Sequence, residues 1–430
     1  MLSTLSTGQV TTLTVEKPAA GGRMIARAGR QIVLVAGAIP GERVTARISR
    51  VGKGVAYGET ISVEDPSADR RQSFTDPFCG GCLYAHIEYS RQLALKGQVI
   101  ADAFLRIGRI PLPVTPRVLA SPDEGYRLRG RLHLGAGHSR PGFFREGTHD
   151  FCDARGTRQL LPATCDAVER LVAALRSLDA TTPYEIEVSE NIDASQRVVH
   201  LDAIASASPP QLSGLRQVDG VSGVTTAALV IGGDPYVTDV LLIENRPVTL
   251  RRHVLAFFQG NRYLLQDLVA HVVGPIESGS SVVDLYAGVG VFSIAAALAR
   301  GASVTAVEGD HVSARDLDEN ARAAGGAIEV LHQDVETFTA RSRPKSGTLG
   351  TLDMLILDPP RTGLSKAALE GAIGLRARRL IYVSCDVATL ARDSRRLLDA
   401  GYAIAAVEAF DLFPNTPHVE TVVRFENVRI

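Results

Sequence analysis

Apolar and polar residues alternate along the first part of the chain, from Gln9 to about Asp65. A period of two is typical of strands with one buried face, and turns rich in Gly and Pro divide this stretch into short segments. The segments that carry the alternation span residues 10–15, 31–35, 42–51 and 58–63. Short strands joined by such turns predict a small β-barrel.

The pattern becomes irregular between residues 66 and 250. Strand-like runs occur there at residues 126–134, 185–188 and 198–203. One helix is clear, because residues 87–107 place Lys96 and several apolar side chains at helical spacing and the pattern ends at Gly108. We expect a mixed α+β central domain whose amphipathic helix, residues 87–107, packs on the domain that follows.

From about residue 278 onward, strands and helices alternate as they do in a parallel sheet with right-handed crossovers. The expected strands span residues 281–285, 303–307, 328–331, 353–357 and 380–384. The expected helices span residues 291–300, 312–324, 366–373 and 388–400, and an antiparallel pair at 402–410 and 419–425 closes the sheet. This predicts a Rossmann-like α/β domain, and a division of the chain into domains 1–68, 69–255 and 256–430.

Composition supports a folded chain of several domains. With 430 residues, 45% of them hydrophobic, it can bury two or three cores, and disorder is not expected. The longest apolar runs, such as residues 292–298, are far shorter than the roughly 20 residues that cross a bilayer, and the N-terminus lacks a charged segment followed by an apolar one. We therefore expect a cytoplasmic protein without a membrane span.

Charge and cysteine content add two hypotheses. The net charge of −1 hides arginine clusters at residues 127–131, 251–252 and 376–379, which suit either a bound polyanion or solvated faces. Five cysteines, two of them closely spaced, favour reduced thiols or metal ligands over a disulfide framework.

A Gly-rich turn, residues 284–290, follows the first strand of the α/β domain. Glycines such as Gly288 let the backbone approach a ligand there, although many such turns are only tight connections. Glu308 ends the second strand, where a carboxylate can accept hydrogen bonds from both ribose hydroxyls, and Asp334 follows the third, where it can reach an adenine amine. This combination favours S-adenosylmethionine over NAD.

Three further segments bear on the chemistry. Asp358-Pro359-Pro360-Arg361 ends the fourth strand at the ligand-binding edge of the sheet, as a substrate-holding turn or as a merely rigid loop. Cys385 ends the next strand, as an exposed nucleophile or as buried packing. Glu420 follows 35 residues later and could be its acid/base partner.

Together these segments resemble the RNA (uracil-5-)-methyltransferase family, which makes 5-methyluridine. The resemblance rests on residues 257–261 (Phe-Phe-Gln-Gly-Asn), 284–290, 358–361, 384–385, 392–393 and 413–421. Residues 40–42 (Pro-Gly-Glu) and 69–71 (Asp-Arg-Arg) make the N-terminal part similar to a TRAM domain, an RNA-binding barrel. Nearly the whole chain is covered, with the middle matched weakly.

The chemistry of uracil gives these residues roles. Carbon 5 is a poor nucleophile, so a thiolate must first add at carbon 6, and a base must later remove the carbon 5 proton. By the resemblance, Cys385 is the nucleophile and Glu420 the base. Gln259 and Asp358 would orient the sulfonium and the uracil, and Tyr286 would line the cofactor pocket.

The target base must leave its stack to reach such a site. Phe257, Phe258 and Phe413 are possible stacking platforms, or else core residues. A barrel of TRAM type favours 23S ribosomal RNA as the substrate of a monomeric enzyme. The alternatives are the T-loop uridine of tRNA, a non-catalytic RNA-binding or assembly factor of the same fold, and an enzyme acting on DNA or on cytosine carbon 5.

The resemblance departs in its cysteines. Family members with a TRAM domain usually hold a [4Fe-4S] cluster with four cysteines, but here only Cys79 and Cys82 match, while Ser73 and Arg158 stand at the other two positions. Cys152 and Cys165 flank Arg158, so a rearranged site remains arithmetically possible. We expect instead that the cluster has been lost. After the nucleophile, residues 386–387 (Asp-Val) replace the usual Asn-Pro.

Overall fold

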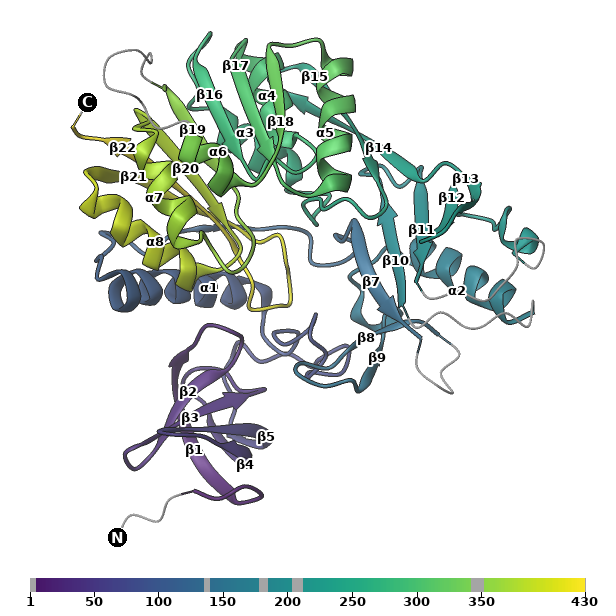
Figure 1. Cartoon of the computed structure of the whole chain (residues 1–430). Coiled ribbons are helices and arrows are strands. Elements are labelled where there is room, and N and C mark those ends of the chain that lie inside the picture. The colour runs from purple at the N-terminus through teal and green to yellow at the C-terminus, as the bar shows by residue number, and fades with distance from the viewer. Residues whose placement is uncertain (1–4, 135–139, 178–184, 203–211, 342–351, 430) are drawn as a thin grey trace.

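The computed structural model describes residues 5–134, 140–177, 185–202, 212–341 and 352–429. Figure 1 shows three groups of elements: an N-terminal barrel, a central sheet, and an α/β layer to which the elements from residue 265 onward and helix α1 belong. No helix in these ranges is long and apolar enough to cross a membrane.

The barrel is closed and five-stranded, with the order β1-β2-β3-β5-β4. Its strands are β1 (Val10–Pro18), β2 (Met24–Ala28), β3 (Gln31–Ala36), β4 (Arg43–Val51) and β5 (Val55–Asp65). The alternation puts every second side chain inside; Val33 and Val35, for example, are completely buried. Strand β2 was not expected from the sequence, because the turn at Gly21-Gly22 hides its short alternating run.

Helix α1 (Tyr89–Ala103) continues as a π-helical turn, η1 (Phe104–Gly108), and connects two cores. Its Leu95 belongs to the core of the barrel, whereas Val99 and Ile100 belong to a core of the α/β layer. Strand β6 (Val118–Leu119) follows and pairs with β21 at the edge of the large sheet. The helix expected at residues 87–107 therefore joins the barrel to the α/β layer.

The central part is a seven-stranded sheet of order β13-β12-β11-β10-β7-β8-β9 and a two-stranded ribbon. The sheet contains β7 (Arg129–His133), β8 (Gly142–Phe144), β9 (Phe151–Asp153), β10 (Glu185–Glu190), β11 (Arg197–Leu201), β12 (Gly223–Thr226) and β13 (Val230–Gly233). Short helices η2 (Arg155–Thr157) and η3 (Ser213–Leu215) complete the sheet. The ribbon of β14 (Tyr236–Ile243) and β15 (Arg246–His253) packs instead in a core shared with α3 and α4, through Leu241 and Val248. Helix α2 (Pro162–Ser177), which was not expected, packs on the sheet through Val168 and Leu171.

The large sheet has eight strands in the order β18-β17-β16-β19-β20-β22-β21-β6. Its remaining strands are β16 (Ser281–Leu285), β17 (Ser303–Glu308), β18 (Ile328–His332), β19 (Met354–Leu357), β20 (Arg379–Ser384), β21 (Tyr402–Phe410) and β22 (Glu420–Asn427). Its helices are α3 (Leu265–Val273), α4 (Val291–Arg300), α5 (His311–Ala324), α6 (Val335–Arg341), α7 (Lys366–Gly374) and α8 (Val387–Asp399). The expected strands and helices are confirmed within a few residues, and α3 and α6 are additional.

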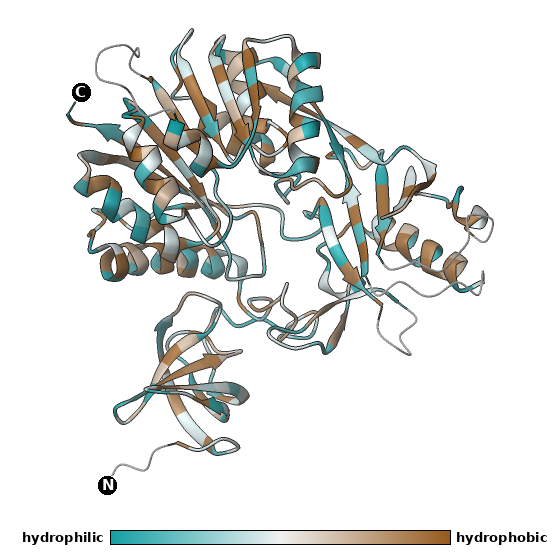
Figure 2. Ribbon diagram, in the orientation of Figure 1, coloured by the Kyte–Doolittle hydropathy of each residue, from teal (hydrophilic) through white to brown (hydrophobic). Residues whose placement is uncertain are grey.

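Both faces of this sheet are covered, which explains its apolar strands (Figure 2). Neighbouring residues of one strand enter different cores: Val282 packs with α3 and α4, and Val283 packs on the other side with α1 and α8. The carboxyl ends of β16, β17, β19 and β20 consequently meet at one edge, where open α/β sheets bind ligands.

Candidate active site

A cavity of about 910 Å³ opens at this edge of the sheet, and residues 126–131 of the central part form part of its wall. Seven of the eight residues expected to bind the cofactor or catalyse the reaction line it: Gln259, Tyr286, Gly288, Glu308, Asp358, Cys385 and Glu420. These residues come from six separate segments of the chain, since Tyr286 and Gly288 share one turn. The fold therefore gathers almost the whole expected site in one cavity.

The turn after β16 is shaped by left-handed backbone. Tyr286, Gly288 and Gly290 have φ angles of 65°, 57° and 95°, which is costly for the one non-glycine residue, Tyr286. Gly290 precedes α4, and a Cβ there would lie 2.6 Å from the side chain of Leu317. The turn is thereby forced close to the cavity, with Tyr286 in its wall.

Glu308 is fixed by this turn. Its two carboxylate oxygens accept hydrogen bonds from the backbone N–H groups of Gly288 and Asp310, each at 2.7 Å. Glu308 also lines the cavity, and a carboxylate has more acceptor sites than these two bonds use, as binding of a ribose diol requires. Asp334 lies beside the same loop, since a Cβ at Gly309 would be 3.2 Å from its Oδ1, but it is exposed and does not line the cavity.

Carboxyl groups crowd the floor of the cavity. Asp358 accepts a hydrogen bond from Nε2 of Gln259 at 2.9 Å, and burial, then the nearby Asp284, raises its pKa to about 7. Burial also raises the pKa of Asp284 to about 7; Ser293 donates to its Oδ2, whereas its buried Oδ1 has no partner. Asp284 does not itself line the cavity, but several other carboxyls do, and a pocket lined by carboxyls fits a cationic ligand such as S-adenosylmethionine.

Cys385 and Glu420 face each other on neighbouring strands. Ser384, at the end of β20, pairs with Thr421 of antiparallel β22, so the next residues along, Cys385 and Glu420, stand opposite one another. Burial, and after it the charge of Glu420, raises the pKa of the Cys385 thiol to about 12. Burial and then Asp358 raise the pKa of Glu420 well above its usual range.

Arg361 opposes both of these shifts. Its guanidinium lies in the cavity wall and lowers the pKa values of Cys385 and Glu420, although burial outweighs it. It is the cation that favours the thiolate form of Cys385. The sequence alone gave it no role, although its place directly after Asp358-Pro359-Pro360 was a usable signal.

Of the three arginine clusters, only the one at residues 127–131 reaches the cavity. Glu187 accepts hydrogen bonds there from Arg129 and Arg131. In the second cluster, Arg252 is completely buried against Asp239. The third lies at the amino end of β20, the opposite edge of the sheet from the cavity. These two clusters are therefore not part of the site.

The three aromatic candidates differ in exposure. All three line the cavity: Phe257 is 61% exposed, Phe413 is partly buried, and Phe258 is buried and also belongs to a core. Phe257 is thus the most exposed of the three rings that a base in the cavity can contact.

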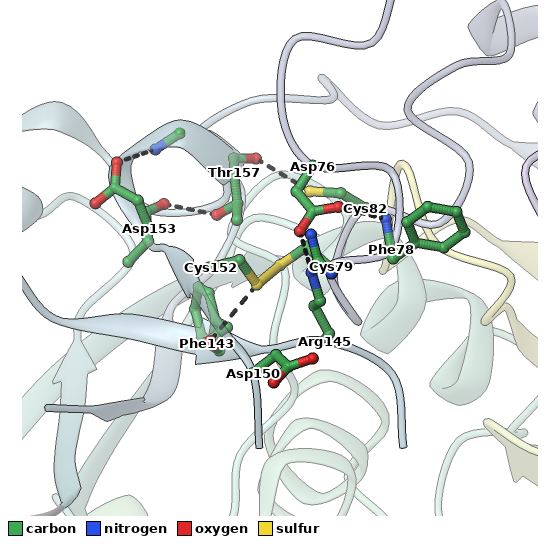
Figure 3. The surroundings of a disulfide bond; sticks show 12 residues. Asp76, Phe78, Cys79, Cys82, Phe143, Arg145, Asp150, Cys152, Asp153 and Thr157 are labelled. Carbon is green, nitrogen blue, oxygen red and sulfur yellow. Dashed lines mark hydrogen bonds and ion pairs between the residues drawn. A yellow bond between two sulfur atoms is a disulfide. The ribbon is translucent and has the colours of Figure 1, made fainter. Parts of the chain in front are cut away.

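The cysteines contradict the expectation of reduced thiols, because Cys79 forms a disulfide with Cys152 (Figure 3). The hairpin of β8 and β9 lies against the Cys79 turn, where the N–H of Gly80 donates to the carbonyl of Phe144 at 3.1 Å, and this brings Cys152 over Cys79. The distance between the two cysteines in the sequence, 73 residues, concealed this contact.

The other cysteines do not complete a cluster site. Cys82 keeps a buried free thiol beside the carbonyl of Thr157, and Cys165 lies in the separate core under α2. Among the residues that the structure describes, no three His, Cys, Asp or Glu side chains are grouped so as to hold a metal ion. The donor set present here does not fit an iron–sulfur cluster.

Comparison with known proteins agrees with this geometry. A family model described as tRNA (Uracil-5-)-methyltransferase matches residues 217–428, and one described as TRAM domain matches residues 5–61. The 23S rRNA (uracil(1939)-C(5))-methyltransferase of Azoarcus sp. (strain BH72) is 30% identical over 426 residues, covering 94% of this chain and 97% of that protein. The chain belongs to the RNA uracil-5-methyltransferase family.

Two further comparisons concern a relative and the fold. The enzyme of the same name from Acidithiobacillus ferrooxidans is 30% identical and covers 94% of each chain. The crystal structure of Pyrococcus abyssi tRNA (uracil-54, C5)-methyltransferase with S-adenosyl-L-homocysteine has a TM-score of 0.74 over 96% of this chain and 99% of that one, at 22% identity. The solved structure shows a shared fold, and the family makes this chain an RNA uracil-5-methyltransferase with an N-terminal TRAM domain, and not a non-catalytic factor.

Proposed function

We propose that this enzyme methylates uridine in 23S ribosomal RNA, with Cys385 as the nucleophile and Glu420 as the base. The observation that carries the proposal is the pairing of β20 with β22, which sets these two side chains opposite each other in the cavity. One group can attack the uracil ring while the other stays within reach of its carbon 5 proton.

In the first step the sulfur of Cys385 bonds to carbon 6 of the uracil, and the electron pair of the 5,6 double bond moves toward O4 as an enolate. Carbon 5 is then nucleophilic, and bound S-adenosylmethionine supplies the methyl group to it. Because burial raises the thiol pKa to about 12, the charge of Arg361 must favour the thiolate at the moment of attack.

In the second step Glu420 takes the proton from carbon 5, the electron pair of that bond re-forms the 5,6 double bond, and the carbon 6–sulfur bond breaks. Glu420 is 2% exposed, so water has little access to it. Its raised pKa makes the carboxylate a stronger base than an exposed glutamate. The products are 5-methyluridine, S-adenosylhomocysteine as the leaving group, the regenerated Cys385 thiolate, and a proton on Glu420.

The remaining residues hold the two substrates. Glu308 would bind the ribose hydroxyls, Gly288 would allow close approach of the ligand to the backbone, and Tyr286 would line the adenosyl side. Gln259 and Asp358 would orient the sulfonium and the uracil between the cofactor turn and Cys385. Asp334 would contribute to the adenine site from the rim.

Ribosomal RNA is proposed because relatives at 30% identity over nearly the whole chain carry that name. The solved tRNA enzyme is 22% identical and informs only the fold. The experiment is nucleoside mass spectrometry of ribosomal and transfer RNA, fractionated separately, from cells with the gene, without it, and with a Cys385→Ala copy. Loss of 5-methyluridine from 23S RNA alone, restored by the wild-type gene only, is expected.

Loss of 5-methyluridine from the tRNA fraction instead would show that tRNA is the substrate and would leave the proposed reaction unchanged. Unchanged 5-methyluridine in both fractions would contradict the proposed function.

A further inference from the structure

Helix α1 contacts the segment that connects β21 to β22, residues 411–419, which we call the catalytic loop. The loop leaves the sheet after Phe410 and re-enters it at Glu420, and it carries Phe413 into the cavity wall. Both of its ends are fixed by strand pairing. Its middle has no regular structure, so side chains from elsewhere must hold it.

Lys96 of α1 makes one of these contacts. Its Nζ donates to Oδ1 of Asp411 at 2.5 Å and to the backbone carbonyl of Phe413 at 3.1 Å. The side chains of Lys96 and Asp411 are completely buried. An ion pair in such a place is costly to desolvate, and a well-packed apolar pair would hold two elements together as well. The Phe413 carbonyl also accepts from the hydroxyl of Thr416 at 2.7 Å and from its N–H at 3.2 Å, which form a turn within the loop. What an apolar side chain at position 96 cannot do is bond this turn to α1.

Gln92 lies one turn earlier on the same face of α1 and makes a second contact with the loop. Its Oε1 accepts from the N–H of Asn415 at 3.0 Å, and its Nε2 donates to the Asn415 side chain at 2.9 Å. Gln92 is completely buried, and Asn415 has a φ angle of 62°, a conformation that these two bonds support. The contacts of Lys96 and Gln92 thus bind the loop to α1 on both sides of Phe413.

We propose that Lys96 and Gln92 form a positioning clamp: from outside the cavity they set the catalytic loop, and with it Phe413, relative to Cys385 and Glu420. The inference rests on the proposed function of that cavity. Neither residue lines the cavity, so the clamp acts only through the loop. A displacement of the loop by about 1 Å is enough to lower the rate about 100-fold, because attack on carbon 6 needs an aligned ring.

The main test uses two variants. The double variant Lys96→Met/Asp411→Leu replaces the buried ion pair by apolar residues of similar length, and the single variant Gln92→Leu removes the contact with Asn415. Both changes avoid leaving a charge unpaired. We expect kcat to fall between about 10- and 100-fold with KM for RNA and S-adenosylmethionine within about twofold, since positioning acts in the transition state. In a Glu420→Gln background, the rate of covalent adduct formation should fall by the same factor.

Lys17→Met is the matched control. It removes another ion pair of α1, between Lys17 and Asp102 at 2.8 Å, but no contact with the loop, and should leave kcat unchanged. A double variant that folds, binds S-adenosylmethionine and turns over at the wild-type kcat would overturn the proposal, as would a folded Gln92→Leu variant with that kcat.

Hydrogen exchange of the amides in residues 411–419 measures the clamp without catalysis. Faster exchange there in both variants, but not in Lys17→Met, is expected. Unchanged exchange would overturn the clamp whatever reaction the enzyme performs, whereas a wild-type enzyme that makes no 5-methyluridine would overturn only the proposed function.

Discussion

Gln259 and Asp358, 99 residues apart in the chain, are joined across the cavity by a 2.9 Å hydrogen bond from the amide Nε2 to the carboxylate Oδ2. The bond connects the segment before α3 to the turn after β19. It also opposes the burial that raises the pKa of Asp358. The pair therefore favours the charged form, and fixes the orientation, of the carboxyl that stands between the cofactor turn and Cys385.

Gln259→Met should lower kcat/KM by about 10- to 100-fold, since a hydrogen bond to a charged group contributes about 1.5–3 kcal/mol. Steady-state methylation of RNA measures it. Gln266→Met, at an exposed glutamine of α3, is the control and should behave as wild type. Wild-type kcat/KM in Gln259→Met would show that the bond does not contribute to the reaction.

The carboxyl pKa values predict how stability changes with pH. In the native state Asp358 has a pKa of about 7, above its ordinary value near 3.8, so between these values the folded protein binds the extra proton. Its contribution is fully favourable below about pH 4 and is lost as the pH rises through about 7. Above about pH 7 the buried negative charge of Asp358 lowers the free energy of unfolding, and Asp358→Asn removes that charge.

Asp358→Asn should accordingly melt higher than wild type at pH 8 and lose this advantage at pH 4.5, while its methylation activity falls at both. Thermal unfolding at the two pH values is the measurement. An advantage of Asp358→Asn that grows toward low pH would contradict the raised pKa.

Glu308→Gln should weaken binding of S-adenosylhomocysteine by about 10- to 100-fold. The carboxylate accepts from two backbone N–H groups, and an amide nitrogen in place of one oxygen would face a donor. Isothermal titration calorimetry measures the affinity. Asp334→Asn, at the rim, should change it by less than about threefold, and an equal loss in both variants would show that Asp334 reaches the adenine.

The disulfide gives a prediction on stability. Unfolded without reductant, the protein should expose three thiols, and five after reduction, because Cys79 and Cys152 are bonded to each other. Reduction should lower the melting temperature, since closing a long loop contributes about 2–5 kcal/mol. Cys152→Ser should melt at that lower temperature with or without reductant, whereas Cys165→Ser should respond as wild type. Five thiols before reduction would exclude the bond.

Much of the α/β layer could be predicted because its period, its turns and its strand ends all point to the same structure. Strand β16 at residues 281–285 and helix α4 at residues 291–300 have the predicted bounds. Helix α2 was missed although Pro162 stands at its first position, a usual place for proline, and an amphipathic pattern follows. Its irregular surroundings concealed it.

The site was predictable where motifs follow strand ends, and not where it depends on contacts distant in sequence. Cys385 and Glu420 come at the ends of paired strands, so their meeting follows from the topology. Lys96 has only the pattern of a helix face, and nothing nearby in the sequence indicates that it meets Asp411, 315 residues away. The Cys79–Cys152 bond is hidden in the same way.

The central claim is that Cys385 adds to the uracil and Glu420 completes the reaction. The most direct measurement incubates Glu420→Gln with 23S RNA transcript and S-adenosylmethionine, followed by a denaturing gel and peptide mass spectrometry. The account predicts a stable protein–RNA adduct with a methylated uracil bonded to Cys385, absent in the Cys385→Ala/Glu420→Gln double variant. No adduct in Glu420→Gln, together with 5-methyluridine still formed by Cys385→Ala, would contradict it.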